Sequence, residues 1–242
     1  MFKDSISDIN TLFNNGKIDE TISKSLILLK ESPNIPEIHN ILGVSYSLKG
    51  QNDLCIKHLK EVLRLEPGNA EANNNLGGVL IECQNYDEAI KFLENAIRIK
   101  PDFSNPYYNR GIFFQKKGKI KEAILSFKKA IGLKKDYFAA YNNLGNCFKD
   151  INNFKEAIYY YNKAKELDNN NPSIYYNMGV VYQKMNIHAE AVNCYNNAIL
   201  LNPNLTLAYY NLGNSLNFIG EIEKAIKSYY KAVALNPNSE KI

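Results

Sequence analysis

The sequence predicts an all-α protein made of repeated pairs of helices. Two observations carry this prediction. Small residues recur at a spacing of 34 positions, and the apolar residues around them follow the 3.6-residue period of an amphipathic helix. The most regular row consists of six glycines in one register, with no insertion or deletion between them. These repeat glycines are Gly43, Gly77, Gly111, Gly145, Gly179 and Gly213.

Two further rows of small residues accompany the repeat glycines. Twelve positions after each glycine stand Cys55, Ala89, Ala123, Ala157, Ala191 and Ala225. Nineteen positions after it stand Val62, Ala96, Ala130, Ala164, Ala198 and Ala232. A glycine inside a helix costs about 1 kcal/mol in helix propensity, so its recurrence predicts a place where two helices approach closely. We interpret these rows as scaffold.

Each unit of the repeat is predicted to hold two helices joined by a turn. In the first helix, Tyr141, Leu144 and Phe148 share one face with Gly145. The turns carry residues that break helices, namely Gly50, Gly118, Gly220 and the pair Asn152–Asn153. Proline cannot continue a helix, and it follows the second helix at Pro33, Pro67, Pro101, Pro203 and Pro237.

The segments 141–148 (YNNLGNCF) and 154–158 (FKEAI) resemble the consensus of the tetratricopeptide repeat family. The resemblance implies a right-handed α-solenoid of about seven 34-residue helix–turn–helix repeats, with a concave wall built from the first helices. One solenoid is predicted over 2–239, with a tail at 240–242. Residues 2–35 are a degenerate capping repeat, with Ile9 in the glycine slot and Thr21 in the alanine slot. The regular repeats are 36–69, 70–103, 104–137, 138–171, 172–205 and 206–239.

Composition narrows the function. The net charge is only +4, from 29 basic and 25 acidic residues, which is no strong footprint for nucleic acid or an anionic membrane. No apolar run approaches the roughly 20 residues that span a membrane, and the first residues lack a secretory signal. The four cysteines are widely and irregularly spaced, so a disulfide framework is not expected. We expect a cytoplasmic protein that binds neither nucleic acid nor membrane.

A stripe on the predicted first helices is rich in asparagine and tyrosine. Two positions before the repeat glycine lies a row, here called the ladder, which consists of Asn75, Asn109, Asn143, Asn177 and Asn211. Neighbouring rows add Tyr108, Asn142, Asn146, Tyr176, Tyr210 and Asn214. An amide both donates and accepts hydrogen bonds, and tyrosine adds area with a polar tip. These residues predict a nearly neutral groove that binds an extended peptide.

A similar asparagine ladder holds extended substrates in the repeat region of O-GlcNAc transferase-type proteins, which the chain resembles most within the family. The resemblance implies a protein–protein interaction scaffold without enzyme activity, whose partner is a protein or an extended peptide. Two interpretations of the ladder stay open, namely contact with a peptide and a general preference for asparagine on this helix surface. The alternative for the whole chain is the N-terminal substrate-recognition region of a larger glycosyl- or sulfotransferase.

Other functional classes find little support. A carboxylate clamp for chaperone tails needs lysine six positions before the repeat glycine, where the chain carries Glu37, Glu71, Asn105, Ala139, Ser173 and Leu207. His39, His58 and Cys55 share one repeat, and we interpret them as packing residues. No catalytic constellation and no glycine-rich phosphate loop is present, so neither a metal nor a cofactor is expected.

The last predicted helix, 222–235, carries Ile226, Tyr229 and Val233 on one face. In this family a further polar-faced helix often covers that end of the stack. An exposed apolar patch usually marks an interaction site. We therefore expect self-association or contact with another domain through this uncapped C-terminal helix.

Overall fold

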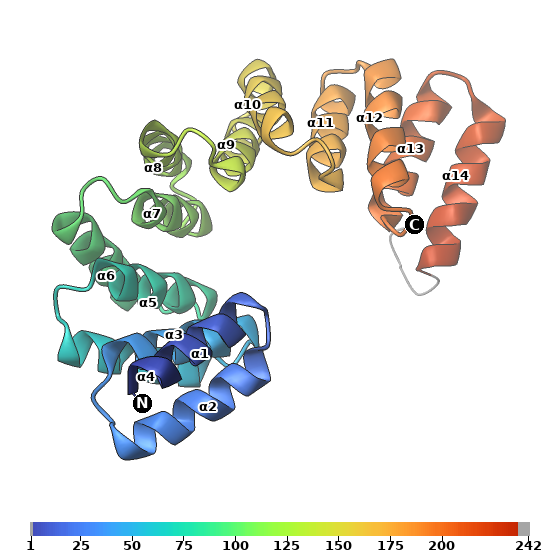
Figure 1. The fold of residues 1–242 in the computed structure, drawn as a ribbon. Helices are drawn as coiled ribbons and strands as arrows, with labels where there is room; N and C mark the ends of the chain where they lie inside the picture. Colours follow the sequence, from blue (N-terminus) through green and yellow to red (C-terminus); the bar gives the residue numbers. More distant parts are fainter. Residues whose placement is uncertain (1, 237–242) are drawn as a thin grey trace. The chain divides into compact units, whose positions relative to one another are not determined.

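The computed structural model describes residues 2–236, which form fourteen α-helices and no strand (Figure 1). The predicted all-α fold of helix pairs is confirmed. Two compact units divide the chain, Met1–Leu133 and Lys134–Ile242. Pro237 and the predicted tail 240–242 lie outside the described residues, and the exact limits of each repeat stay a prediction.

The first unit holds four helix pairs, in which each helix lies beside the next one along the chain (Figure 1). The first helices also touch one another, α1 with α3, α3 with α5 and α5 with α7. The helices of this unit are α1 (Phe2–Asn14), α2 (Ile18–Glu31), α3 (Pro36–Leu48), α4 (Asn52–Leu65), α5 (Ala70–Glu82), α6 (Tyr86–Ile99), α7 (Ser104–Lys116) and α8 (Ile120–Leu133).

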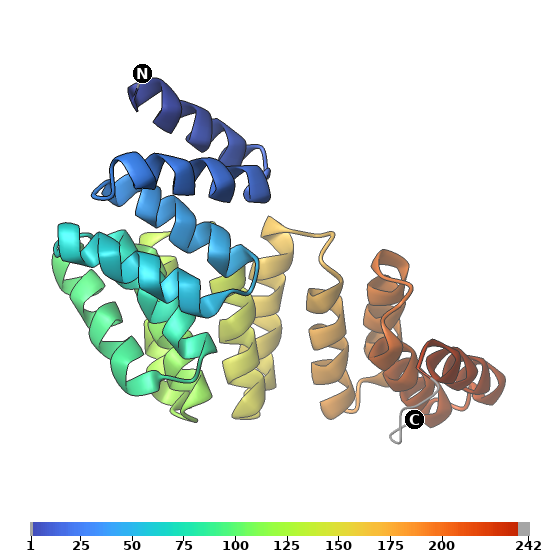
Figure 2. The same ribbon diagram turned by 90° about the horizontal axis from the view of Figure 1, so that it is seen from below.

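The second unit repeats this arrangement with three helix pairs, which Figure 2 shows from a direction perpendicular to that of Figure 1. Its first helices again touch in series, α9 with α11 and α11 with α13. The helices are α9 (Phe138–Asp150), α10 (Phe154–Leu167), α11 (Pro172–Lys184), α12 (His188–Leu201), α13 (Thr206–Phe218) and α14 (Ile222–Leu235).

The turn inside every helix pair has the same backbone form. One residue adopts a positive φ, and these residues are 34 positions apart: Gly16, Gly50, Gln84, Gly118, Asn152, Asn186 and Gly220. At Gly50 the amide N–H bonds to Ser47 O at 2.9 Å, and the next amide, of Gln51, bonds to Tyr46 O at 2.9 Å. This is the pattern by which a left-handed residue satisfies the last carbonyls of a helix. Glycine or asparagine fills six of the seven positions because both tolerate that conformation.

Each repeat glycine lies under a large side chain from the second helix of its own pair. The side chain stands sixteen positions later, and the row reads Leu59, Leu93, Phe127, Tyr161, Tyr195 and Tyr229. A Cβ atom added to any of the six glycines would lie 2.5–2.9 Å from that side chain, which is closer than atoms can pack. The close approach predicted from the glycine row is therefore present. The alanine rows serve the same contact, and Ala89, Ala123, Ala157 and Ala191 are fully buried.

In the first helix pair the large residue stands in the glycine slot, and the small residue stands at the position sixteen residues later. Ile9 occupies the glycine slot and is 1% exposed. The equivalent position sixteen residues later holds Ser25, a small residue that is also buried. Large and small residues have changed places, which keeps the total volume of the contact similar. The degenerate appearance of residues 2–35 therefore reflects a different solution to the same packing problem.

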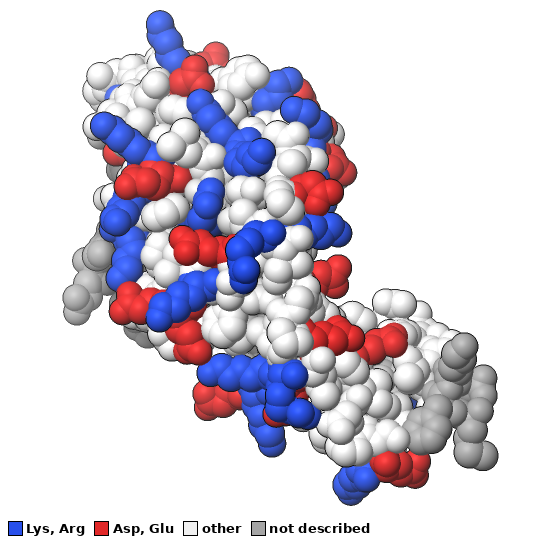
Figure 3. Space-filling model, turned by 90° about the vertical axis from the view of Figure 1, so that its left-hand side faces the viewer, with Lys and Arg blue, Asp and Glu red and all other residues white. Residues whose placement is uncertain are grey.

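The outward faces of the helices carry mixed charge. Figure 3 shows lysine and arginine side chains interspersed with aspartate and glutamate on one face of the molecule. Pairs such as Lys60–Glu88 at 3.1 Å and Arg64–Glu61 at 2.7 Å are exposed to solvent. Such pairs contribute little to stability. This face agrees with the small net charge and presents no large region of one sign.

Candidate functional site

The ladder and its neighbouring rows lie on the first helices α5, α7, α9, α11 and α13. All eleven residues predicted for the groove are half-buried, so they are neither core residues nor fully solvated ones. In the row three positions before the glycine, Asn74 is more deeply buried than these residues and is only 5% exposed. In the same way Ile41, which takes the ladder position of the first regular repeat, is buried. The stripe therefore contributes partly to packing between repeats.

Hydrogen bonds connect the ladder from one repeat to the next. Asn109 Nδ2 donates to Asn74 Oδ1 at 2.9 Å. Asn177 Nδ2 donates to Asn142 Oδ1 at 3.3 Å. In each case a ladder amide bonds the residue 35 positions earlier, and the bond fixes the orientation of the amide plane.

Tyrosine takes the acceptor role where the earlier residue is not an amide. Asn211 Nδ2 donates to the hydroxyl oxygen of Tyr176 at 3.2 Å. Each of these bonds uses one of the two hydrogens on the ladder amide. A carboxamide has two N–H donors and an oxygen with two lone pairs, so the ladder keeps hydrogen-bonding capacity for a ligand.

A second set of bonds fixes the row that follows the glycine. In the second unit, the buried Tyr161 donates its hydroxyl to Asn146 Oδ1 at 2.7 Å, and Tyr229 donates to Asn214 Oδ1 at 2.9 Å. Burial raises the pKa of Tyr161 well above its usual range. Asn146 and Asn214, predicted as groove residues, are thus also acceptors for tyrosines that reach through from the second helices.

The residue choice in the first unit follows the same logic. Its second helices carry Leu59, Leu93 and Phe127 under the glycines, and none of these has a hydroxyl to satisfy. The corresponding positions after the glycines are apolar or glycine, namely Val44, Gly78 and Ile112. Tyr195 differs from the other two tyrosines, because the position after its glycine is the apolar Val180. Its hydroxyl donates instead to Gln183 Oε1 at 2.9 Å, one helical turn further along. This relation could have been found in the sequence by comparing the two rows.

His39 and His58 form a packing cluster. His39 Nδ1 lies 2.9 Å from His58 Nδ1, and His39 Nε2 lies 2.8 Å from the carbonyl oxygen of Pro33. The ring of Tyr46 stacks on His58, with centroids 5.5 Å apart. Burial, followed by the charge of His39, lowers the pKa of His58 to about 4. Within the part of the chain that is described, no group of three metal-ligating side chains is found.

Three of the four cysteines, Cys55, Cys147 and Cys194, are buried and lack the environment of a nucleophile. Burial raises the pKa of Cys55 to about 11, that of Cys147 to about 12 and that of Cys194 to about 11. A reactive cysteine has a lowered pKa that favours the thiolate. These three thiols therefore stay protonated and act as small core residues.

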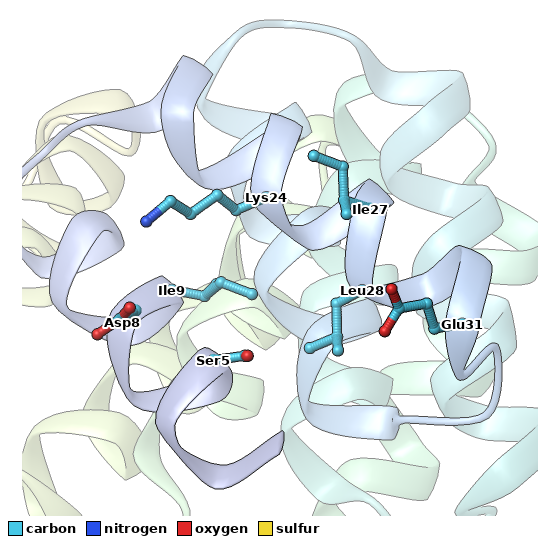
Figure 4. A pocket seen from close by; sticks show the side chains of 7 residues that line it. All are labelled: Ser5, Asp8, Ile9, Lys24, Ile27, Leu28 and Glu31. Carbon is cyan, nitrogen blue, oxygen red and sulfur yellow. The ribbon is translucent and has the colours of Figure 1, made fainter. Parts of the chain in front are cut away.

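A hollow of about 270 Å³ lies at the first helix pair, between α1 and α2 (Figure 4). Figure 4 shows Ile9 and Leu28 at its centre, with Lys24 and Asp8 toward one side and Glu31 toward the other. Its charged groups have opposite signs and it contains no ladder residue. We do not count it as part of the candidate site.

The last helix, α14, exposes apolar side chains as predicted from its sequence. Ile226 is 46% exposed and Val233 is 44% exposed, and together with Tyr210 and Tyr230 they border an open hollow. The self-association or domain contact expected there stays a prediction. Among residues 2–236, no helix has the length and apolar character needed to cross a bilayer.

Family models of the tetratricopeptide repeat match most of the chain. One model, described as a tetratricopeptide repeat, matches residues 48–110, and another matches 172–205 and 206–239. A third, described as a TPR repeat, matches 114–151 and 145–186. The chain belongs to the tetratricopeptide repeat family. Tetratricopeptide repeat proteins are interaction scaffolds that bind proteins or peptides.

Solved structures with the same tetratricopeptide fold include a chain of the APC/C hetero-tetramer Cut9–Hcn1. It has a TM-score of 0.79 at 18% identity, covering 96% of this chain and 46% of that one. This chain therefore spans less than half the length of that protein. MamA matches with a TM-score of 0.64 at 25% identity, covering 69% of this chain and 98% of that one.

A third similar structure is YrrB, described as a TPR protein with an unusual peptide-binding site. It has a TM-score of 0.63 at 22% identity, covering 74% of this chain and 93% of that one. A comparison with curated proteins finds no match. The more specific resemblance to O-GlcNAc transferase-type repeats stays a prediction.

The hydroxyl of Tyr161 offers a direct test of the tetratricopeptide packing. We expect Tyr161→Phe to lower the free energy of unfolding by about 1 kcal/mol, because the bond to Asn146 is lost while the ring is kept. Tyr159→Phe, on the same helix and 53% exposed, is the matched control and should be neutral. Urea denaturation of both variants measures the difference, and equal stabilities would show that the Tyr161 bond has no energetic role.

Proposed function

We propose that the chain is a protein-interaction scaffold that binds an extended peptide, or an extended segment of a partner protein, along the ladder face. The observation that carries this proposal is the orientation of the ladder amides by bonds between repeats. A binding surface loses less entropy on association when its groups are already held in place. Asn109, Asn177 and Asn211 are held in this way on three different first helices.

Tyrosine side chains support the same use of this face. Tyr176 contacts Tyr195 and Tyr210 contacts Tyr229, each with ring centroids 6.0 Å apart. Tyr108 contacts Phe127 at 5.7 Å in the same relative position. These half-buried rings offer rigid apolar area beside the amides, a combination common in protein-binding surfaces. The backbone of an extended ligand would thus bind the ladder amides, and its side chains would contact the tyrosine rings of the same stripe.

The similarity to YrrB makes a peptide the first ligand class to test, since that protein is described as having a peptide-binding site. The likeness is one of fold. The chemistry of the ladder face therefore provides the main support for the proposal. No feature of the described residues favours the alternative of a substrate-recognition region of a larger transferase.

A triple variant tests the ladder. We expect Asn109→Ala, Asn143→Ala and Asn177→Ala together to weaken binding of peptides selected on the wild-type chain by at least tenfold. The variant also loses the bonds that Asn109 and Asn177 donate to the preceding repeats, so the free energy of unfolding should fall by about 1–3 kcal/mol. Binding is therefore measured by fluorescence anisotropy well below the melting temperature of the variant.

The control carries three asparagine-to-alanine changes on second helices, at Asn95, Asn162 and Asn196. It should bind the selected peptides with wild-type affinity. Equal affinities of the folded triple variant and the wild type would place the binding site elsewhere. Failure to select any peptide or partner segment on the wild-type chain would contradict the proposed function itself.

A further inference from the structure

The ladder face of the first unit contains a hollow of about 240 Å³ beside Gly78. Gly78 directly follows the repeat glycine of α5. The same position carries a side chain in every other regular repeat: Val44, Ile112, Asn146, Val180 and Asn214. A Cβ atom at Gly78 would meet only the Asn109 side chain, with Nδ2 at 3.4 Å and Cγ at 3.9 Å, so a side chain fits sterically at this place. The missing side chain opens the hollow, while packing would have allowed it to be filled.

The walls of the hollow differ in polarity. Val44 and Val79 line it with apolar surface, together with the buried Leu59. Asn75 and Asn109, both ladder residues, line it with amide groups. Asn109 is held by the bond from its Nδ2 to Asn74 Oδ1 at 2.9 Å. Asn75 Oδ1 already accepts from Asn74 Nδ2 at 3.1 Å and keeps a second lone pair.

The charge at this hollow is negative. Glu82 lines it, and no lysine, arginine or histidine does. No ion pair of Glu82 is found among residues 2–236. The Glu82 charge reaches into the hollow, because after burial it is the next cause of the raised pKa of Cys55, another lining residue. A carboxylate without a counter-charge attracts a cation.

We propose that this hollow, bordered by Gly78, Glu82 and the ladder amides, receives one lysine or arginine side chain of a bound extended peptide. The aliphatic stem lies along Val44 and Val79, and the cationic head reaches Glu82 and the amide oxygen of Asn75. This inference rests on the proposed function and adds a sequence requirement for its ligand. The hollow is smaller than the roughly 300–1,000 Å³ typical of small-molecule sites, and its size suits a single long side chain.

An adjacent hollow limits the alternatives. It shares Gly78, Glu82 and Asn109 with the first hollow and extends toward Ile112 and Lys116. Lys116 stands only on this second side, so an acidic ligand side chain would find its partner there. On the first side the same acidic side chain would meet Glu82 without a counter-charge. Lys116 offsets the charge of Glu82 only in the second hollow, so the first hollow has the larger excess of negative charge.

The experiment starts from a random dodecapeptide library displayed on phage and selected on the full wild-type chain. We expect the selected peptides to share a lysine or arginine at one position. Replacing that residue by norleucine should weaken binding roughly fivefold, the upper range for a partly exposed ion pair. Glu82→Gln should weaken binding of the original peptide by a similar factor and leave the affinity of the norleucine peptide unchanged. Glu94→Gln, an exposed change on α6, is the matched control.

A second variant tests the cavity independently of charge. Gly78→Val introduces the residue that the chain itself carries at positions 44 and 180. The variant should weaken binding of the selected basic peptide by tenfold or more, because the valine side chain fills the hollow. Gly132→Val, in a helix position with no neighbouring atom within 4 Å, controls for the helix propensity of valine.

The outcomes separate the two proposals. Selected peptides that share no basic residue, or whose affinity is unchanged by both Glu82→Gln and Gly78→Val, overturn the basic-side-chain pocket and leave the ladder intact if the triple asparagine variant still weakens them. A selection that yields no binding peptide at all contradicts the proposed function and removes the pocket with it.

Discussion

Replacing Gly145 by leucine is expected to lower the free energy of unfolding by roughly 3 kcal/mol. A Cβ atom at this position would lie 2.6 Å from the ring of Tyr161, and the rest of a leucine side chain would extend further into the same space. Overpacking a dense core typically costs 1–3 kcal/mol. Displacing the ring also weakens the hydroxyl bond to Asn146, which adds about 1 kcal/mol. Urea denaturation followed by circular dichroism measures the loss.

Gly132 is the matched control for Gly145, because it also lies inside a helix but has open space around it. Alanine at Gly132 should stabilise the chain by up to about 1 kcal/mol, since alanine is the better helix former. Alanine at Gly145 should destabilise it despite the same gain in propensity. Effects of the same sign at the two positions would show that the close contact in the second unit does not limit the size of residue 145.

The stability of the first unit is expected to fall as the pH drops from about 6.5 toward 4. His58 has a folded-state pKa of about 4, against 6.5 for the free side chain. Between these values the unfolded chain binds a proton at His58 that the folded chain does not bind. Stability therefore rises with pH across this window, is complete above it and stays low below it. Each pKa unit corresponds to about 1.36 kcal/mol, so the lowering of the pKa from 6.5 to about 4 predicts a loss of roughly 3 kcal/mol.

The geometry explains why His58 stays neutral. Because the carbonyl of Pro33 accepts a hydrogen from His39 Nε2, the Nδ1 atom of His39 is the acceptor for Nδ1–H of His58. A charge on His58 would be buried beside the Tyr46 ring, which can offer it only a π face. Glu61 partly offsets this effect, while Lys57 adds to it.

The control for the pH effect comes from another repeat of the same chain. Tyr141 and Tyr160 occupy the positions of the two histidines, with rings stacked 6.4 Å apart. The double variant His39→Tyr and His58→Tyr copies that pair and should lose most of the dependence of stability on pH between 4 and 6.5. Thermal unfolding at several pH values measures the slope, and an unchanged slope would assign it to other groups.

The period of the sequence was enough to predict the helix pairs and their turns. The glycine and alanine rows predict the helix contacts, because small residues that recur every 34 positions mark the places where two helices approach closely. The direction of side-chain hydrogen bonds was not predictable in this way. Asn146 and Asn109 look alike in the sequence, yet one accepts from a tyrosine of its own pair and the other donates to the preceding repeat.

The hollow at Gly78 shows a second limit of sequence reasoning. The sequence contains the Gly77–Gly78 pair, but the residues that line the hollow come from four helices whose relative rotation the period does not specify. Glu82 was missed because it lies at the helix end, outside the rows compared. The exchange of large and small residues at Ile9 and Ser25 is not evident from the glycine row alone. It becomes evident only when the row sixteen positions later is considered as well.

That exchange between Ile9 and Ser25 has a consequence for how the chain folds. Near-identical repeats in one register can pair with the wrong neighbour, and such misassembly is a known hazard of repeat proteins. If α1 docked on α4, α6 or any later second helix of its unit, Ile9 would collide with Leu59, Leu93 or Phe127. If a later first helix docked on α2, its glycine would face Ser25 across an empty space. The sizes of Ile9 and Ser25 therefore favour the pairing of α1 with α2 over these alternatives.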